Sequence, residues 1–252
     1  MIEILPLFQT GVLSLCVSLP IFGIRQMEWV SSATSRKLLH ISMAPIFMLC
    51  WCFFSDGDSG KYTAVIVPLA FTLCFWMLGK GALRLPFISN SMSRSGSASE
   101  LALGPFHYGV CISLCTLLFW KRTEALFCMF PVAFGDGIAA FCGSVRGNKP
   151  LWWNASKTWF GFLAFVIVTF LSLVCGCWLF QHNHWCINSD PACIPHALFV
   201  AVMCGLAESL SVPNYDNYCI FFMGVLAYAF VYYECLQQTH HSDLETMVTK
   251  RL

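Results

Sequence analysis

The sequence predicts an all-α membrane protein, a polytopic helical bundle of about seven or eight transmembrane helices forming a single integral membrane domain over residues 1–252. Three observations predict this fold. Apolar residues make up 58% of the chain and charged residues only 11%, whereas soluble domains carry roughly 25% charged residues. The apolar residues gather in runs of about 16 to 22 residues, near the roughly 20 that cross a bilayer as one helix. The segments of alternating polarity that would indicate a membrane β-barrel do not occur.

Eight apolar runs are the predicted spans. In chain order they are Ile4–Ile24, Leu38–Phe54, Tyr62–Gly79, Leu103–Trp120, Ala125–Phe141, Trp159–Phe180, Pro195–Leu210 and Tyr218–Cys235. The shortest runs also fit tilted helices buried in protein, so seven and eight spans both agree with the sequence. The N-terminus has no basic segment before its apolar run and lacks the Arg- and Ser-rich composition of a transit peptide, so we expect the first run to be a retained span.

Lysine and arginine are distributed unequally between the two ends of these spans. The loops that follow odd-numbered spans hold nine of them, and the other loops with the C-terminal tail hold five. Because cytoplasmic loops carry the excess of Lys and Arg, we expect the odd loops to face the cytoplasm or the stroma. The net charge of +1 gives no support for a nucleic-acid partner.

The fifteen cysteines do not form a recognisable metal or redox motif. Most of them, such as Cys50 and Cys115, sit in apolar runs, where cysteine behaves as a small hydrophobic residue. No CxxC pair occurs, which argues against a zinc ribbon or a thioredoxin-like motif. The loop before the seventh span could bind zinc or form a disulfide, although its spacing matches no standard site; its candidates are His182, His184, Cys186, Cys193 and His196.

Three acidic residues lie at the ends of predicted spans, all toward the odd-loop face: Asp136, Glu208 and Asp216. A charged residue costs roughly 2.5–3.5 kcal/mol at the centre of a membrane helix, so such residues usually have a partner or a function. Carboxylates are suitable ligands for Mg²⁺, which in turn bridges phosphate oxygens. We therefore expect these three residues to be metal ligands, with Asp136 as the principal one.

The segment from Gly135 to Gly161 contains the densest set of candidate phosphate-binding residues. Glycines permit tight turns and close approach of backbone amides to an anion, and lysines neutralise phosphate charge. The candidates here are Gly135, Gly137, Gly143, Gly147, Lys149 and Lys157. The segment is neither a Walker A nor a Rossmann motif. A glycine-rich helix end with ordinary loop cations is the alternative interpretation.

Two further cationic motifs precede spans. RKLLH begins with Arg36 and Lys37, which either neutralise phosphate or extend from a helix start toward the membrane surface. SRSGSASE contributes Arg94 and Glu100, and Glu100 would also be favourable simply as a first-turn acid of a helix. Each motif is weak by itself.

Taken together and in order, these motifs resemble the polyprenol kinase family, and most of all its phytol/farnesol kinase branch. The matching residues run from Arg36 to Asn217: RK-x-x-H, SRSGSASELALGPFHY, GDG-x-A with its later glycines, the Lys157–Thr158 pair, and Glu208–Ser209 with Asp216–Asn217. The chain departs from the pattern at Ala140 and Tyr215, where related sequences often carry acidic residues. The motif-bearing core is therefore expected at about residues 36–217.

The resemblance implies a kinase that phosphorylates a membrane isoprenoid alcohol such as phytol or farnesol. It implies CTP, or else UTP or ATP, as the phosphoryl donor with Mg²⁺, and an endoplasmic reticulum or plastid membrane as the location. Asp136, Arg36, Lys37, Glu208 and Asp216 would be the catalytic residues, with Glu208 or Asp216 either adding a metal ligand or accepting the proton of the alcohol. The alternatives are a dolichol or diacylglycerol kinase of the same family, or an ion- or proton-coupled transporter.

Overall fold

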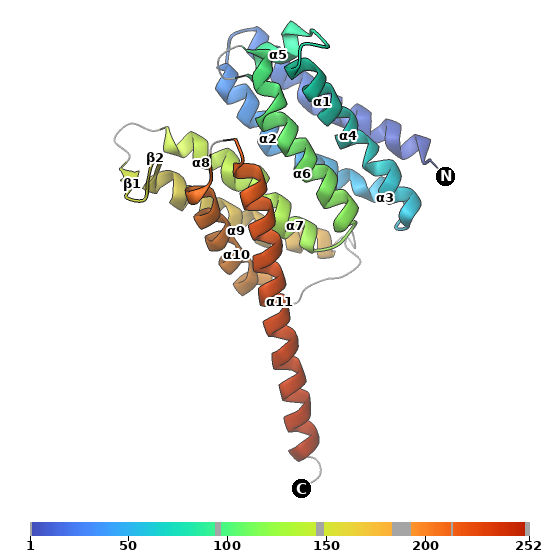
Figure 1. Ribbon diagram of the computed structural model, residues 1–252. Coiled ribbons are helices and arrows are strands. Elements are labelled where there is room, and N and C mark those ends of the chain that lie inside the picture. The colour runs from blue at the N-terminus through green and yellow to red at the C-terminus, as the bar shows by residue number, and fades with distance from the viewer. Residues whose placement is uncertain (1, 94–96, 145–148, 183–192, 213, 250–252) are drawn as a thin grey trace.

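Helices make up nearly all of the part of the chain that the computed structural model describes, residues 2–93, 97–144, 149–182, 193–212 and 214–249 (Figure 1). The elements are α1 (Ile4–Gln26), α2 (Ser32–Leu49), the 3-10 helix η1 (Cys50–Phe53), α3 (Asp58–Ala64), α4 (Ile66–Gly79), α5 (Pro86–Met92), the 3-10 helix η2 (Ala98–Ala102), α6 (Gly104–Leu118), α7 (Glu124–Phe130), the π-helix η3 (Pro131–Gly135), α8 (Asp136–Gly143), β1 (Pro150–Leu151), β2 (Asn154–Thr158), α9 (Trp159–His182), α10 (Cys193–Leu210) and α11 (Asp216–Thr249).

The predicted fold class, an all-α polytopic bundle, is confirmed. Within the described residues, six helical stretches are long and apolar enough to cross a membrane: Ile4–Gln26, Ser32–Phe53, Asp58–Gly79, Ala98–Leu118, Glu124–Gly143 and Trp159–Phe180. They coincide with the first six predicted spans. The seventh predicted span corresponds to a shorter apolar helix, Ile194–Leu210, and the eighth lies within α11. Whether seven or eight helices cross the membrane stays a prediction.

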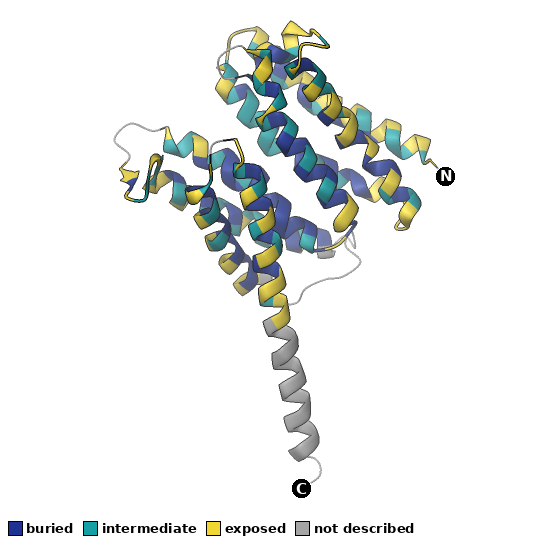
Figure 2. Cartoon of the chain, viewed as in Figure 1, coloured by how far each residue is buried: buried dark blue, intermediate teal, exposed yellow. Residues whose placement is uncertain are grey.

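The polarity of α1 is reversed relative to a helix of a soluble protein. Its buried positions include Thr10, Ser14 and Ser18, which are spaced four residues apart and therefore share one face. Large apolar side chains such as Leu5 and Phe8 are exposed on the same helix, and Figure 2 shows exposed positions at its N-terminal end. Small polar residues inside and large apolar residues outside are the arrangement expected where lipid is the solvent.

The helices pack as two neighbouring groups, α1 to α6 and α7 to α11 (Figure 1). Two helices of the first group make the junction between them. The helix α2 contacts η3 and α8, and α6 contacts α7 and α11. The candidate site lies where these two groups meet.

Close helix contacts depend on glycine at several of these crossings. A Cβ atom on Gly224 of α11 would lie 2.5 Å from the Phe127 carbonyl oxygen of α7, and one on Gly109 of α6 would lie 2.1 Å from Thr72 Oγ1 of α4. Small residues permit such close approach of membrane helices.

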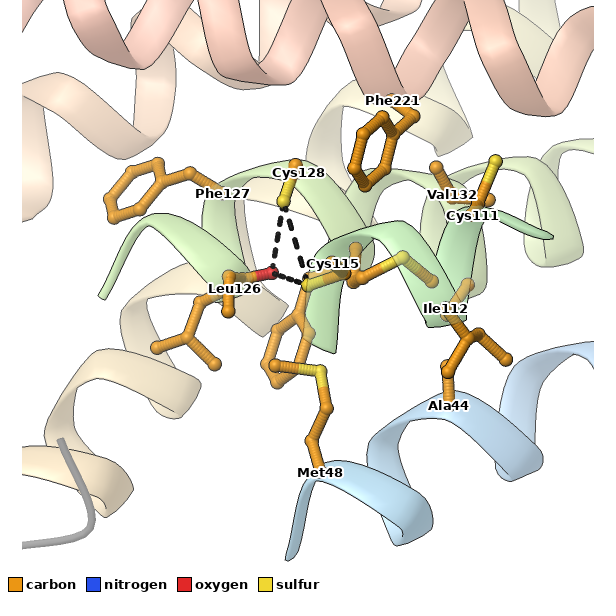
Figure 3. Close-up of a cluster of buried hydrophobic side chains, with 14 of the residues drawn as sticks. Ala44, Met48, Cys111, Ile112, Cys115, Leu126, Phe127, Cys128, Val132 and Phe221 are labelled. Carbon is orange, nitrogen blue, oxygen red and sulfur yellow. Dashed lines mark hydrogen bonds between the residues drawn. The ribbon is translucent and has the colours of Figure 1, made fainter. Parts of the chain in front are cut away.

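Cysteines fill part of the apolar core, as expected from their positions in the sequence. Cys115 of α6 and Cys128 of α7 are buried with their sulfur atoms 3.8 Å apart, beside Phe127 and Phe221 (Figure 3). All cysteines whose side chains the structure describes are free thiols. The cysteine and histidine candidates of the loop before α10 lie outside the described side chains, except for His196.

The helix that carries Asp136 changes its winding just before that residue. Pro131 has no N–H to donate, and the turn Pro131–Gly135 is a π-helix in which the Asp136 N–H donates to the Pro131 carbonyl. Such π-helical turns often occur at functional sites. The sequence did not predict this turn, nor the antiparallel hairpin of β1 and β2 in the fifth loop.

Candidate active site

Two adjoining cavities lie at the junction of the helix groups. The larger, which we call the polar chamber, has a volume of about 400 Å³. The smaller, the apolar chamber, has a volume of about 110 Å³. Five residues line both of them: Arg36, Lys37, Asp136, Asn214 and Asp216. These shared residues form the boundary where a group in one chamber can meet a group in the other.

The polar chamber collects the charged residues that the sequence analysis singled out. Its described charged lining residues are Arg36, Lys37, Lys157, Asp136, Glu208 and Asp216. The three acids, which are separated by up to 80 positions in the chain, therefore do converge on one cavity. Cations and carboxylates balance, so the chamber can offer positive groups to phosphate and negative groups to a metal ion at the same time.

The central ion pair of the boundary joins α2 to α8. Ser31 caps α2 by accepting a hydrogen bond from the Thr34 N–H at 3.1 Å, which starts the helix about one turn before the motif. Lys37 Nζ lies 2.8 Å from Asp136 Oδ2 and also donates to the Asp136 carbonyl oxygen at 3.3 Å. Both side chains are nearly enclosed, with 12% and 8% of their surface exposed. Gly104 lies beside the Arg36 guanidinium, and a Cβ there would be in ordinary van der Waals contact with Arg36 Nη1 at 3.5 Å.

His40 is a site residue that sequence reasoning quoted only as part of a motif. It lies one helical turn beyond Lys37, with Nε2 2.9 Å from the Val132 carbonyl oxygen and 3.3 Å from Asp136 Oδ2. Tyr108 donates to the His40 carbonyl oxygen at 2.5 Å. His40 thus ties α2 to the π-helix and holds Asp136 in place. Its spacing of three residues from Lys37 was the available signal, because i and i+3 share a helix face.

A second ion pair, between Lys157 of β2 and Glu208 of α10, forms the far wall of the polar chamber. The hairpin is fastened to α10 through Ser209, which accepts at its hydroxyl from Trp153 Nε1 at 3.1 Å and at its carbonyl from Asn154 Nδ2 at 2.9 Å. Burial lowers the pKa of Lys157, but attraction to Glu208 outweighs it and raises the pKa overall. Lys157 is therefore a cation over the physiological range of pH.

The turn before α11 brings Asp216 to the boundary. Asn214 adopts a left-handed backbone conformation, with φ of 72°, which asparagine tolerates better than most residues. His107 of α6 holds this turn through a 2.8 Å hydrogen bond between Nδ1 and the Asn214 carbonyl oxygen. Tyr215, at a position where related sequences often carry an acid, instead stacks on the His107 ring at 5.3 Å. Asp216 is half-buried and begins α11, where the helix dipole favours a negative charge.

The predicted phosphate-binding residues are only partly gathered. Gly143 lines the polar chamber. The structure differs from expectation at Gly135 and Gly137, which lie in helix rather than in a turn and are not among the described lining residues. Added Cβ atoms there would lie 2.4 Å from Thr169 Oγ1 and 2.3 Å from Ile41 Cγ1 respectively, so both glycines allow close packing.

Three further candidates are not among the described lining residues. Lys149 is exposed and is not a described lining residue; its carbonyl oxygen accepts from the Trp159 N–H at 3.0 Å. Arg94 and Gly147 lie outside the described residues. Ala140, the other position where an acid was expected from the resemblance, does line the polar chamber.

The carboxylates suit a magnesium ion that arrives with a nucleotide better than a permanently held ion. Over the described residues, no group of three or more His, Cys, Asp or Glu side chains is arranged to hold a metal. Mg²⁺ is commonly bound by only one or two carboxylates together with substrate phosphates and water. Asp136 and Asp216, which both line the boundary, can supply that number.

Comparison with known proteins gives relatives but no structural template. No family model and no solved structure matches the chain. The chain is 33% identical over 143 residues to a probable phytol kinase 2, chloroplastic, of Oryza sativa subsp. japonica, covering 56% of this chain and 46% of that protein. It is 31% identical over 178 residues to a farnesol kinase, chloroplastic, of Arabidopsis thaliana, covering 70% and 58%. Phytol kinase 1, chloroplastic, of Arabidopsis thaliana is 25% identical over 186 residues, covering 73% and 61%. The chain thus spans about half the length of these curated relatives.

Proposed function

This chain belongs to a phytol kinase-like family, and from that premise we propose that it transfers a phosphoryl group from a nucleoside triphosphate to the hydroxyl of a membrane isoprenoid alcohol. The observation that carries the proposal is the pair of chambers with a shared boundary. One chamber has the charges that a triphosphate needs, and the other has the apolar walls that a lipid chain needs. The reaction joins one group of the triphosphate to one group of the lipid, so we place it where the two chambers meet.

The phosphates would lie in the polar chamber. Arg36, Lys37 and Lys157 would neutralise their charge, because guanidinium and ammonium groups bind phosphate oxygens strongly. Asp136 would hold Mg²⁺, which when bound neutralises charge on the transferred phosphoryl group and orients it. Lys37 would then exchange part of its contact with Asp136 for a contact with phosphate. Gly143 would give the nucleotide close access to the backbone of α8.

The alcohol would present its hydroxyl at the boundary with its chain in the apolar chamber. The hydroxyl oxygen forms the new bond to the γ-phosphorus, the bond to the bridging oxygen breaks, and the nucleoside diphosphate leaves. Asp216 is placed to accept the hydroxyl proton, because it lines both chambers, whereas Glu208 lines only the polar chamber and is paired with Lys157. His40 and Tyr108 would position the reacting groups from the apolar side.

We propose CTP as the donor, with UTP and ATP as alternatives, and a plastid membrane as the location, since the relatives named above are described as chloroplastic. The loops that carry Lys157 and Asp216 would face the stroma or cytoplasm, where nucleotides are available. Neither the dolichol or diacylglycerol alternative nor the transporter alternative is favoured by a feature of the two chambers.

The test is phosphorylation by purified full-length protein in lipid nanodiscs. Labelled CTP, UTP or ATP is offered with phytol, farnesol, geranylgeraniol, dolichol or diacylglycerol, and labelled lipid product is measured. We expect product with an isoprenoid alcohol and Mg²⁺, and loss of product in Asp136→Asn. Asp56→Asn is a matched control, because Asp56 pairs with Lys121 at 2.7 Å away from both chambers. Folded protein that phosphorylates none of these alcohols would overturn the proposal, and product confined to diacylglycerol would reassign the substrate.

A further inference from the structure

The apolar chamber follows α2 from the boundary into the bundle. Four lining residues of α2 mark its course: Lys37, His40, Met43 and Phe47. Their spacing of three to four residues places them on one helix face. At about 1.5 Å of rise per residue, the chamber extends about 15 Å from Lys37 to Phe47.

Two other helices give a similar depth independently. On α6, the lining residues run from Gly104, which lies beside Arg36 of the boundary, to Ile112. On α4, which runs in the opposite direction, they run from Phe75 to Val67. Each of these segments spans eight residues, which corresponds to about 12 Å along a helix. The depth of the chamber is therefore about 12 to 15 Å along three of its walls.

A cluster of four aromatic rings, the aromatic plug, closes the inner end of the apolar chamber; its members are Phe47, Trp51, Phe54 and Trp120. The ring centroid of Phe47 lies 6.3 Å from that of Trp51, and Trp51 lies 4.9 Å from Trp120. Phe54 lies 6.2 Å from Trp120, and all four rings are buried. Lys121 fastens the outer side of the plug by donating to the Phe54 carbonyl oxygen at 2.7 Å. A chain that enters from the boundary consequently meets Phe47 and, behind it, a packed aromatic layer.

The dimensions limit how much of an isoprenoid chain can enter. An extended peptide residue has three backbone bonds and spans about 3.3–3.6 Å, so the four chain bonds of an isoprene unit span about 4.5–5 Å. A depth of about 12 to 15 Å then holds about three units. The volume of about 110 Å³ corresponds to roughly seven to eleven water-sized groups, or about two five-carbon units. The depth thus indicates about three units, and the volume about two.

We infer that the apolar chamber is a tail pocket that selects the alcohol by length, and that Phe47 is the residue that sets its limit at the inner end. The inference rests on the proposed kinase function for its choice of ligand. The pocket should accept an isoprenoid alcohol of three units, the length of farnesol, in preference to alcohols of four units such as geranylgeraniol or phytol. Phe47 acts by closing the pocket and takes no part in the chemistry.

The experiment compares catalytic efficiency, kcat/KM, for geranylgeraniol and farnesol, which differ by one isoprene unit and carry the same allylic hydroxyl. Wild-type protein should favour farnesol. Phe47→Ala should raise the geranylgeraniol-to-farnesol ratio by roughly tenfold or more, since groups that do or do not fit an apolar pocket change efficiency by about 10–200-fold. Phe47→Leu, which keeps more of the core volume, should raise the ratio less. Phe180→Ala is the matched control, because Phe180 and Phe47 are each 3% exposed and Phe180 is not a described lining residue; it should leave the ratio unchanged.

Binding without nucleotide separates this inference from the proposed reaction. Stabilisation of the protein against heat is measured with farnesol or geranylgeraniol alone. If no alcohol is phosphorylated, yet farnesol stabilises the wild type more and Phe47→Ala reverses that order, the tail pocket stands and the kinase proposal falls. If alcohols are phosphorylated but neither Phe47 variant changes the ratio, or Phe180→Ala changes it equally, the tail pocket is wrong and the kinase proposal stands.

Discussion

Replacing Asp136 by asparagine should cause two losses that can be separated, one of stability and one of activity. The carboxylate is 2.8 Å from Lys37 Nζ and 3.3 Å from His40 Nε2, and the two side chains of the pair are only 12% and 8% exposed. Water therefore screens the pair little. Removing one partner of a buried pair costs about 3–5 kcal/mol, because the other charge stays buried without compensation.

The lower end of that range is expected for Asp136→Asn. The asparagine carbonyl can still accept a hydrogen bond from Lys37, so we expect a loss of about 3 kcal/mol, which would lower the unfolding midpoint by roughly 6 to 12 °C for a chain of this size. Adding Lys37→Met removes the uncompensated charge, and the double variant should regain most of the lost stability. Both the single and the double variant should be inactive, because both lack the Asp136 carboxylate as a metal ligand. We expect kcat/KM to decrease by at least about a hundredfold in each.

The assay combines thermal unfolding in nanodiscs with phosphorylation of farnesol on the same preparations. Asp56→Asn provides the comparison for removing a carboxylate from the other buried lysine, Lys121. The reasoning fails if the double variant is as unstable as Asp136→Asn alone, since the pair would then not account for the loss. It also fails if either variant phosphorylates farnesol at close to the wild-type rate.

Three other predictions follow from the site and the helix packing. Lys157→Met should decrease kcat/KM and weaken binding of the nucleotide, because a phosphate-neutralising cation is lost and Glu208 is left buried and unpaired; titration with the nucleotide checks this. The pKa of Lys157 is raised in the folded protein. The pairing of Lys157 with Glu208 should therefore stabilise the protein fully below the ordinary lysine pKa of about 10.4, and the stabilisation should be lost as pH rises through the higher folded pKa. Unfolding midpoints are measured from pH 7 to 9, and a decrease in wild type that is absent in Lys157→Met would contradict this prediction. Gly224→Ala should destabilise the protein by about 1–3 kcal/mol, because the added Cβ would lie 2.5 Å from the Phe127 carbonyl oxygen. A Cβ on Gly11 would meet no atom within 4 Å, so Gly11→Ala should be neutral or stabilising in the same thermal assay.

Much of the fold could be predicted because a membrane restricts the choices available to the backbone. A run such as Trp159–Phe180 must satisfy its own hydrogen bonds in lipid, and a helix does so locally. The same reasoning identified Asp136 and Glu208, since a carboxylate within an apolar run is costly without a partner. Local sequence could not predict the π-helix at Pro131, because the widened turn depends on what packs against it.

By itself, the sequence determined the helical class, the position of the apolar runs, the set of charged residues suited to phosphate and metal, and the order of motifs that indicated the family. Tertiary structure alone decided which charges meet: Lys37 pairs with Asp136 across 99 positions of the chain and Lys157 with Glu208 across 51. It also assigned Gly135 and Gly137 to helix packing, drew His40 into the site, and formed an apolar chamber that ends at Phe47. The physical reason is that polarity and periodicity act along the chain, whereas ion pairs and cavities depend on how distant helices cross.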